Sequence, residues 1–334
     1  DLIQNIIKKN NFDGVNSKLA EIKKLKVLII GETIIDQYVF CEALGKSGKE
    51  PVLVLRDLGT ENYLGGVLAI SRHLSDFCDT VSLLSFLGEK NEYKSFIEEN
   101  IEENISLNFL TKSKSPTIVK RRFIDNIDRK KLLGVYSIND NSLLKSEEDQ
   151  FIETYDQLVK KHDLVIVSDY GHGVITSKIA KHISQTDKFV SLNAQVNAAN
   201  IGTHNIKKYH DIDCLIINAT ELRHEMRQRE GNIEDMALIL KKMINSKYIS
   251  VTQGKEGAIL IDDYGKLVRC PGFASEVIDK VGSGDALLAL LSVCLYSKLD
   301  EDLALFISSI AAAQSVETIG NSSPVNKVKL LKTI

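Results

Sequence analysis

An α/β fold is predicted by the alternation of strand-like and helix-like segments along the 334-residue chain. Short apolar runs, typical of buried parallel strands, recur with amphipathic helical patterns between most of them. This alternation indicates a mostly parallel central sheet with helices on both faces, a three-layer α/β/α sandwich. Two regions carry β-like segments without an intervening helix, which indicates an additional small sheet. At about 150 residues per domain, the length allows two domains, or one large domain with an insertion.

The N-terminal segment, residues 1–25, is expected to form a helical extension before the main domain, residues 26–334. Apolar side chains recur in it at helical spacing, at Ile3, Ile6, Ile7, Leu19, Ile22 and Leu25. The first predicted strand follows at Lys26–Ile30 and ends at the turn residue Gly31.

The rest of the central domain repeats this pattern. Five further apolar runs are predicted strands, namely Thr80–Phe86, Asp163–Val167, Lys188–Leu192, Asp213–Ile217 and Lys247–Val251. Helical patterns lie between most of them, for example at Glu147–Lys160, Ser177–Gln185 and Ile233–Ile244. Parallel strands need such connections, which place the helices over the sheet.

The two exceptional regions, residues 36–58 and 106–138, are expected to form a discontinuous β lid inserted into the main domain. Their β-like segments are Tyr38–Cys41, Val52–Leu55, Thr117–Val119 and Lys131–Tyr136. Strands without helical cover are unusual in a parallel α/β sheet, so a separate small sheet explains them best.

Composition and charge argue against several classes of protein. The 42 Lys and Arg residues and 45 Asp and Glu residues leave a net charge of −3, whereas nucleic-acid-binding domains usually carry a basic excess. The longest apolar stretch, near Ala286–Tyr296, is far shorter than the roughly 20 residues of a membrane span, and the first residues lack a signal-peptide pattern. The five scattered cysteines form no CxxC pair. We therefore expect a cytoplasmic protein without nucleic-acid or membrane partners.

Polar residues follow four of the predicted strands directly. Asp169 and Tyr170 come after Val167, and Asn193 comes after Leu192. The segments Asn218–Glu221 and Thr252–Gly254 follow the next two strands. In an open α/β sheet the ligand crevice lies at the carboxyl ends of the strands, so these residues are expected to converge there.

A glycine-rich turn, Asp279–Ala286, opens an apolar helix that continues through Leu295. Glycines let backbone N–H groups approach a phosphate closely, and a helix N-terminus favours negative charge. Asp285 falls in the first turn, where a carboxylate could accept a proton from an attacking hydroxyl. Alternatively, Asp285 simply caps a buried helix. No GK[ST] follows, so the turn is not a P-loop.

Asp279–Ala286 resembles the DTxGAGD signature of the ribokinase-like, phosphofructokinase-B family of sugar kinases. The resemblance runs from about Lys26 to Val325 and includes three other motifs in order, at residues 65–74 (similar to GGxxNVA), 218–221 (NxxE) and 252–257 (TxGxxG). Residues 31–36, 168–173 and 317–320 are most similar to the heptose-7-phosphate kinases of ADP-heptose synthesis. Residues 193–197, with Lys208 and Tyr209, resemble relatives fused to a nucleotidyltransferase module, which this sequence lacks.

The resemblance implies ATP and Mg²⁺ as cofactors and assigns roles to named residues. Asp285 would be the general base, and the backbone N–H groups of Gly282, Ser283 and Gly284 would form an anion hole. Asn218 and Glu221 would position Mg²⁺ through waters. The remaining nucleotide contacts would come from Asn193, Thr252, Gly254 and Gly257. Sugar hydroxyls would be held by Asp36, Gly65, Gly66 and Asp169.

Each of these residues also has an ordinary structural interpretation. Asn218 could cap the helix that starts at Ala219, with Glu221 favoured there by the helix dipole. Gly65 and Gly66 could form an ordinary turn, and Asp169 could close a loop. The ordered co-occurrence of four motifs favours a functional site.

Basic residues suggest that the sugar itself carries a phosphate. Lys120, Arg121 and Arg122 fall in the second lid region and could clamp a distal phosphate, as could Lys46 and Lys49. A solvated strand face is the alternative. Two departures from the family pattern bear on the substrate, namely Ala69 in place of an asparagine and Lys280 in place of a small polar residue.

We therefore expect an ATP- and Mg²⁺-dependent sugar kinase that acts on the anomeric hydroxyl of a heptose 7-phosphate or a close phosphosugar. The alternatives are a family kinase for another sugar or a nucleoside, and a non-catalytic ligand-binding or regulatory protein on the same scaffold. The resemblance also implies a homodimer formed through the lid strands.

Overall fold

Nine strands form the central sheet in a computed structural model that describes residues 4, 6, 12–197, 199–202 and 204–333. Their order is β13-β12-β11-β10-β9-β8-β1-β4-β5, and the seven strands from β11 to β5 run parallel. Their bounds are β1 Lys26–Gly31, β4 Thr80–Gly88, β5 Ile105–Lys112, β8 Leu164–Asp169, β9 Phe189–Ala194, β10 Cys214–Asn218, β11 Tyr248–Thr252, β12 Ala258–Ile261 and β13 Leu267–Cys270. The antiparallel edge strands β12 and β13 were not anticipated from the apolar runs.

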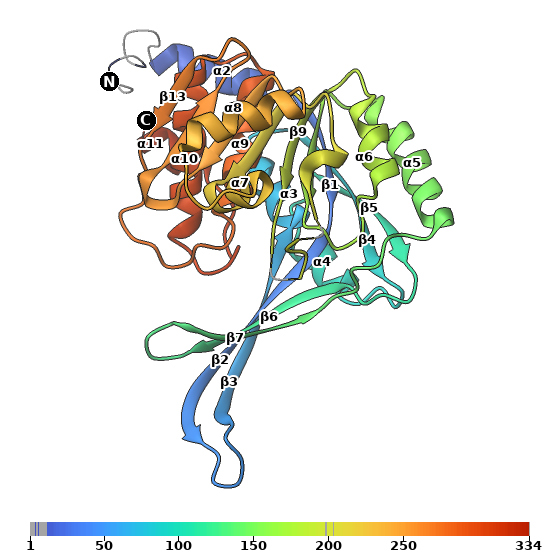
Figure 1. Ribbon diagram of the computed structural model, residues 1–334, viewed down its shortest axis with the longest axis vertical. Coiled ribbons are helices and arrows are strands. Elements are labelled where there is room, and N and C mark those ends of the chain that lie inside the picture. The colour runs from blue at the N-terminus through green and yellow to red at the C-terminus, as the bar shows by residue number, and fades with distance from the viewer. Residues whose placement is uncertain (1–3, 5, 7–11, 198, 203, 334) are drawn as a thin grey trace.

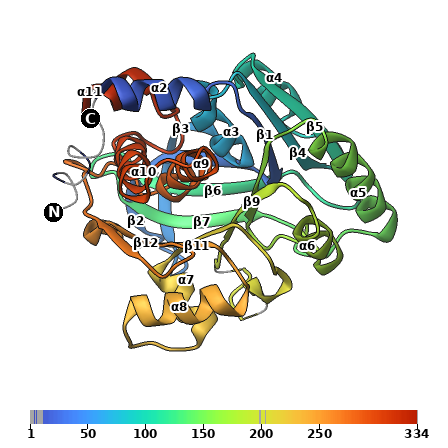
Figure 2. The same cartoon turned by 90° about the horizontal axis from the view of Figure 1, so that it is seen from above.

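Helices cover both faces of this sheet, as Figure 2 shows. Alternate residues of β1 enter two separate cores, with Val27 and Ile29 on one side and Leu28 and Ile30 on the other. The first core is completed by α2 Phe12–Ile22, α3 Val67–Ser75, α4 Lys94–Asn100, α9 Ser283–Tyr296, α10 Glu301–Val316 and α11 Lys327–Thr333. The second is completed by α5 Lys145–Val159, α6 Ser177–Ser184, α7 Ala219–Met226 and α8 Ile233–Met243. The predicted three-layer α/β/α sandwich is confirmed.

A second sheet extends away from the main body (Figure 1). It contains β2 Thr33–Lys46, β3 Leu53–Gly66, β6 Ile118–Asp125 and β7 Lys131–Ser137, in the order β3-β2-β6-β7. Its first hairpin is longer than residues 36–58, because β2 begins directly after β1 and β3 continues to the start of α3. The small sheet is therefore joined to the central sheet through adjacent residues of one chain segment.

The predicted second lid region, residues 106–138, starts too early. Ile105–Lys112 is β5, which pairs in parallel with β4 at the edge of the central sheet. The short helix α4 connects these two strands and was missed, and no strand was predicted at Ile105–Lys112, so this segment was included in the lid region. The contribution to the small sheet begins only at Ile118.

The part of the N-terminal segment that the structure describes packs on the main domain. Val15, Leu19 and Ile22 of α2 are buried in the same core as β1. The predicted helical positions Ile3 and Ile7 lie outside the described residues. Across the described chain, no helix combines the length and the apolar character needed to cross a bilayer.

Candidate active site

Two adjoining cavities lie at the carboxyl ends of the parallel strands, where the crevice was expected. The smaller, about 300 Å³, lies between these strand ends, the small sheet and the start of α9. The larger, about 1030 Å³, extends from there along the loops after β11 and β13. Both are lined by Asn218, Thr252, Lys280, Ser283 and Gly284. The two cavities therefore meet at the glycine-rich turn that opens α9.

Most of the predicted site residues line these cavities. The smaller cavity includes Asp36, Gly66, Lys120, Arg122, Asn193, Asn218, Glu221, Thr252, Gly282, Ser283, Gly284 and Asp285. The larger cavity adds Gly254 and Gly257. Residues from seven different segments are thus brought to one place, and Arg121, Gly65 and Asp169 are not among them.

The glycine-rich turn has a backbone shape that requires glycine at its centre. Gly282 has a φ of 92°, and a Cβ there would lie 2.0 Å from Oδ1 of Asn321. The helix α9 starts at the next residue, and the first N–H groups of a helix have no acceptor within it. Such N–H groups at a helix N-terminus bind anions, so this corner of the two cavities can hold phosphate oxygens.

The first residue of the turn, Asp279, ties it to the small sheet. Its Oδ1 accepts hydrogen bonds from the Lys131 ammonium at 2.5 Å and from the Val281 N–H at 3.1 Å. Its Oδ2 accepts from the Tyr38 hydroxyl and, at 3.1 Å, from the Gly320 N–H. Lys131 lies on β7 and Tyr38 on β2, so two strands of the small sheet hold the start of the turn.

Asp285 presents a buried carboxylate to the smaller cavity and is only 7% exposed. Its Oδ1 accepts a hydrogen bond from the Tyr170 hydroxyl at 2.9 Å. Burial raises the pKa of Asp285 to about 7, with Asp36 adding to the increase and Tyr170 and Lys120 opposing it. A carboxylate with a pKa near the working pH is suited to accept a proton from a hydroxyl group.

Asn218 and Glu221 form a capping box at the start of α7. The Asn218 side chain accepts from the Glu221 N–H at 2.8 Å, and Glu221 Oε2 accepts from the Asn218 N–H at 2.9 Å. Burial raises the pKa of Glu221 to about 7. The structural interpretation of this pair is thus correct, and both residues nevertheless line the smaller cavity. Their oxygens keep free lone pairs, so capping and ligand binding are compatible.

The basic residues of β6 separate onto two faces because successive side chains of a strand alternate. Lys120 and Arg122 line the smaller cavity, where Arg122 forms an ion pair with Asp36. Arg121 points to the other face, and its Nε donates to Gln37. Lys46, at the far end of β2, also lies outside both cavities. Of the three basic residues predicted to bind a phosphate together, only Lys120 and Arg122 therefore lie in the same cavity.

Asp169 lies beneath the cavity and does not line it. It is fully buried, and its Oδ2 accepts from the Lys208 ammonium at 2.6 Å and the Tyr209 hydroxyl at 2.7 Å. Its Oδ1 accepts from the Gly171 N–H at 2.9 Å. Although burial alone would raise the pKa of Asp169, the Lys208 charge and these hydrogen bonds hold it below its usual value. The residue ties the loop after β8 to the segment around Lys208 and Tyr209.

Two further predicted positions act on the cavity indirectly. A Cβ at Gly65 would lie 2.3 Å from Oδ2 of Asp36, so this glycine makes room for the Asp36 carboxylate. Ala69 is buried in α3 and is absent from the lining of either cavity. Ala69 therefore contributes no polar group to the lining of either cavity.

Tyr170 lines the smaller cavity, as expected for a residue that follows a predicted strand, but the sequence assigned it no specific role. It follows β8 directly and is only 4% exposed. Its position in the loop after Asp169 is a signal that could have identified it, because such loops form the crevice. Gln195, in the loop after β9, is a second cavity residue that was missed.

A sequence model described as pfkB family carbohydrate kinase matches residues 24–328. The chain belongs to the pfkB family of carbohydrate kinases. The predicted family and the prediction of a carbohydrate kinase enzyme are confirmed. The matched range includes the glycine-rich turn, Asp285 and all the strands that bring residues to the two cavities.

Among curated proteins, this pfkB-family chain is similar to the bifunctional protein HldE of Campylobacter jejuni. The two are 28% identical over 316 residues, which cover 93% of this chain and 66% of the relative. The HldE protein of Nitratiruptor is 26% identical over 306 residues, covering 89% of this chain and 62% of the relative. The chain thus spans slightly less than two thirds of the length of these relatives.

Among solved structures, the fold is similar to that of ribokinase from Thermotoga maritima. The TM-score is 0.71 at 16% sequence identity, with 92% of this chain and 98% of the other covered. This likeness confirms the ribokinase-like fold expected from the sequence.

Proposed function

We propose that this pfkB-family kinase transfers the γ-phosphate of ATP to a sugar that already carries a phosphate. We further propose that the acceptor is the anomeric hydroxyl of a heptose 7-phosphate or a close phosphosugar. The observation that carries the proposal is the meeting of the two cavities at the glycine-rich turn, with the Asp285 carboxylate on the side of the smaller one. A nucleotide in the larger cavity and a sugar in the smaller would meet at this turn.

In the proposed reaction, Asp285 accepts the proton of the sugar hydroxyl as that oxygen attacks phosphorus. The backbone N–H groups of Gly282, Ser283 and Gly284 stabilise the negative charge that develops on the transferred group. Thr252, with the glycines of the following loop, forms the wall along which the nucleotide lies. The enzyme contributes mainly position and electrostatic stabilisation, as phosphoryl transfer requires.

Asn218 and Glu221 are the residues that would hold Mg²⁺. Among the residues described, no group of three or more histidine, cysteine or acidic side chains is placed to bind a metal directly. One amide oxygen and one carboxylate on a cavity wall suit a cation that keeps most of its water, and Mg²⁺ loses water reluctantly. When bound, Mg²⁺ supplies positive charge to the phosphate oxygens.

The phosphorylated acceptor is supported by the cations of the smaller cavity. Arg122 is already paired with Asp36. Lys120, by contrast, has no carboxylate within ion-pairing distance among the residues that the structure describes. The residue is only 8% exposed, and its ammonium lies 5.0 Å from the centroid of the Tyr170 ring. A buried ammonium without a paired anion is suited to bind an anionic substrate.

A coupled assay of ADP formation on a panel of sugars tests this proposal. We expect turnover with heptose 7-phosphate, and much less with the same heptose lacking the phosphate, with ribose or with a nucleoside. Replacing Lys120 with methionine should raise KM for the phosphosugar about 10- to 100-fold, because a hydrogen bond to a charged group contributes about 1.5–3 kcal/mol.

Arg121→Met is the matched control for this variant, because it removes a neighbouring charge from the opposite face of β6. It should leave KM for the phosphosugar unchanged. Equal effects of the two substitutions, or faster turnover of an unphosphorylated sugar, would contradict the phosphosugar assignment. ATP binding without ADP formation on every sugar would favour a non-catalytic protein.

We also propose that a second copy of the chain packs against the small sheet. Its two outer strands carry exposed apolar side chains, among them Leu53 and Leu58 on β3 and Leu133 and Val135 on β7. A second copy would remove such side chains from water. Light scattering should give twice the 37.2 kDa mass of one chain. A mass of one chain at assay concentrations would contradict this assembly.

The likeness to the HldE relatives supports the heptose assignment and suggests a link with a second activity. Because those relatives are named bifunctional and are longer than this chain, we propose that a nucleotidyltransferase module acts with it, either on the same protein or on another.

A further inference from the structure

Tyr170 lines the smaller cavity next to the carboxylate proposed as the base. Its side chain is almost fully buried and lines the cavity. Its hydroxyl donates to Oδ1 of Asp285 at 2.9 Å. Among the described residues, this is the one hydrogen bond recorded for the Asp285 carboxylate. Oδ1 is therefore occupied, and Oδ2 is the oxygen that remains for the hydroxyl of a substrate.

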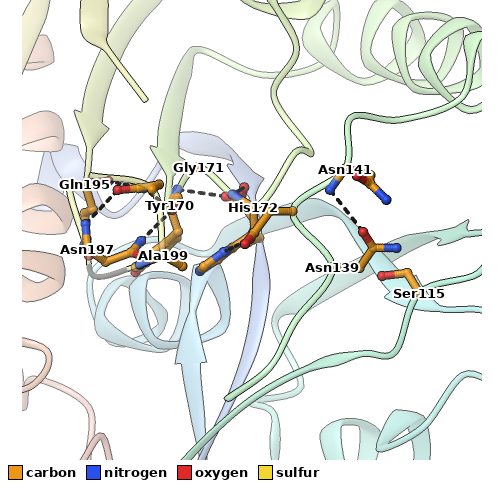
Figure 3. A network of polar contacts seen from close by, with 12 residues as sticks. Ser115, Asn139, Asn141, Tyr170, Gly171, His172, Gln195, Asn197 and Ala199 are labelled. Atoms are coloured by element: carbon orange, nitrogen blue, oxygen red, sulfur yellow. Dashed lines mark hydrogen bonds and ion pairs between the residues drawn. The ribbon is translucent and has the colours of Figure 1, made fainter. Parts of the chain in front are cut away.

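The backbone of Tyr170 is held on both sides, as Figure 3 shows for part of the network. Its N–H donates to Oε2 of the buried Glu32 at 2.9 Å. Its carbonyl accepts from the side-chain amides of Asn197 and Asn200, each at 2.8 Å. These contacts come from the ends of β1 and β9. The hydroxyl of Tyr170 is thus fixed in space by the same strand ends that form the crevice.

We propose that Tyr170 is a positioning residue of this kinase, whose hydroxyl fixes the orientation of the Asp285 carboxylate and stabilises its ionised form. The proposal rests on the proposed function, because it assigns Tyr170 a role through the base. It gives a role to a residue that lies within the segment 168–173 but to which the family resemblance assigned none.

The charges around Asp285 determine what removal of this hydroxyl would do. Asp36 on β2 and Glu221 on α7 raise the pKa of Asp285, in addition to burial, and Lys120 on β6 lowers it. The hydrogen bond from Tyr170 also lowers it. Without that bond the pKa of Asp285 rises, so a higher pH is needed to ionise the base. The acid limb of the kcat profile must then move to higher pH.

The test is Tyr170→Phe, assayed for kcat, both KM values and the pH profile. We expect kcat near neutral pH to fall about 10- to 100-fold. This fall is smaller than the one expected for loss of the base itself, because the Asp285 carboxylate is still present. Both KM values should stay close to those of the wild type, and activity should partly recover above about pH 8. The fall should disappear in the Asp285→Asn background, because residues that act as a unit are not additive.

Tyr136→Phe is the matched control. Tyr136 also lies beside Lys120, with its ring centroid 5.9 Å from the ammonium, but has no bond to Asp285. This variant should keep the wild-type pH profile. If Tyr170→Phe folds poorly, 3-fluorotyrosine at position 170 preserves the ring and strengthens the donor, and it should move the acid limb to lower pH.

A wild-type kcat and an unmoved acid limb in Tyr170→Phe would overturn the proposal, as would a rise in KM alone. Failure of the proposed function looks different. If the proposed function is wrong, the Asp285→Asn variant keeps normal turnover. If Asp285→Asn is inactive but Tyr170→Phe behaves like the wild type, only the role of Tyr170 is overturned.

Discussion

Replacing Asp285 with asparagine is expected to lower kcat by about a thousandfold or more, because the variant cannot accept the proton of the attacking hydroxyl. The amide keeps the size of the side chain and can still accept the hydrogen bond from Tyr170. KM for either substrate should therefore change little. Steady-state assays of ADP formation measure this directly, and near-normal turnover would show that Asp285 is not the base.

The same variant has an expected effect on stability, with a sign set by the pKa. Folding raises the pKa of Asp285 from 3.8 to about 7. The free energy of unfolding therefore falls as the pH rises from 3.8 to about 7, and it stays at the lower value at higher pH. The asparagine variant lacks this loss, so its melting temperature should equal or exceed that of the wild type at about pH 8. Asp149→Asn, at an exposed position of α5, is the matched control. It should leave kcat unchanged and should not raise the melting temperature at about pH 8.

Replacing Gly282 with alanine is expected to lower kcat by about 100-fold or more, which is typical for loss of anion-stabilising donors. The φ of 92° disfavours any side chain, and the new Cβ would lie 2.0 Å from Oδ1 of Asn321. The turn must therefore shift, and its N–H groups move away from the transferred phosphate. The strain should also destabilise the fold by about 1–3 kcal/mol.

Ser283→Ala is the matched control, because it changes the next residue of the turn but keeps the backbone N–H and requires no new conformation. It should retain nearly the wild-type kcat and melting temperature. Kinetic assays and thermal melts of both variants test the assignment. A Gly282→Ala enzyme with wild-type turnover would mean that the geometry of this turn is not used in the reaction.

The sequence was most informative where residues close in the chain act together. The apolar runs identified six of the central strands, since a strand buried on both faces needs continuous apolar side chains. The glycine-rich turn and the first turn of α9 lie within eight residues, so their pattern alone indicated an anion site. At Asn218 and Glu221 the capping interpretation and the ligand interpretation both describe the same local geometry.

The sequence was less informative about edges and faces. The edge strand β5 was not predicted, and its residues were included in the lid region because the short connecting helix α4 went unrecognised. The edge hairpin of β12 and β13 was likewise missed. β5 is only partly buried along most of its length, and β12 and β13 have four residues each, so the apolar signal of each strand is weak.

What the sequence determined by itself was therefore the kind of fold, the family and the residues of each local motif. Only the tertiary structure decided which of these residues share a cavity. Lys120 and Arg121 are neighbours in the chain, yet strand alternation sends them to opposite faces of β6. Asp169 and Tyr170 are also neighbours, but Asp169 forms an ion pair with Lys208 beneath the cavity, whereas the Tyr170 hydroxyl donates a hydrogen bond to Asp285. The surroundings that a side chain meets depend on the elements that pack against each face of its strand. Because those elements are distant in sequence, only the tertiary structure shows them.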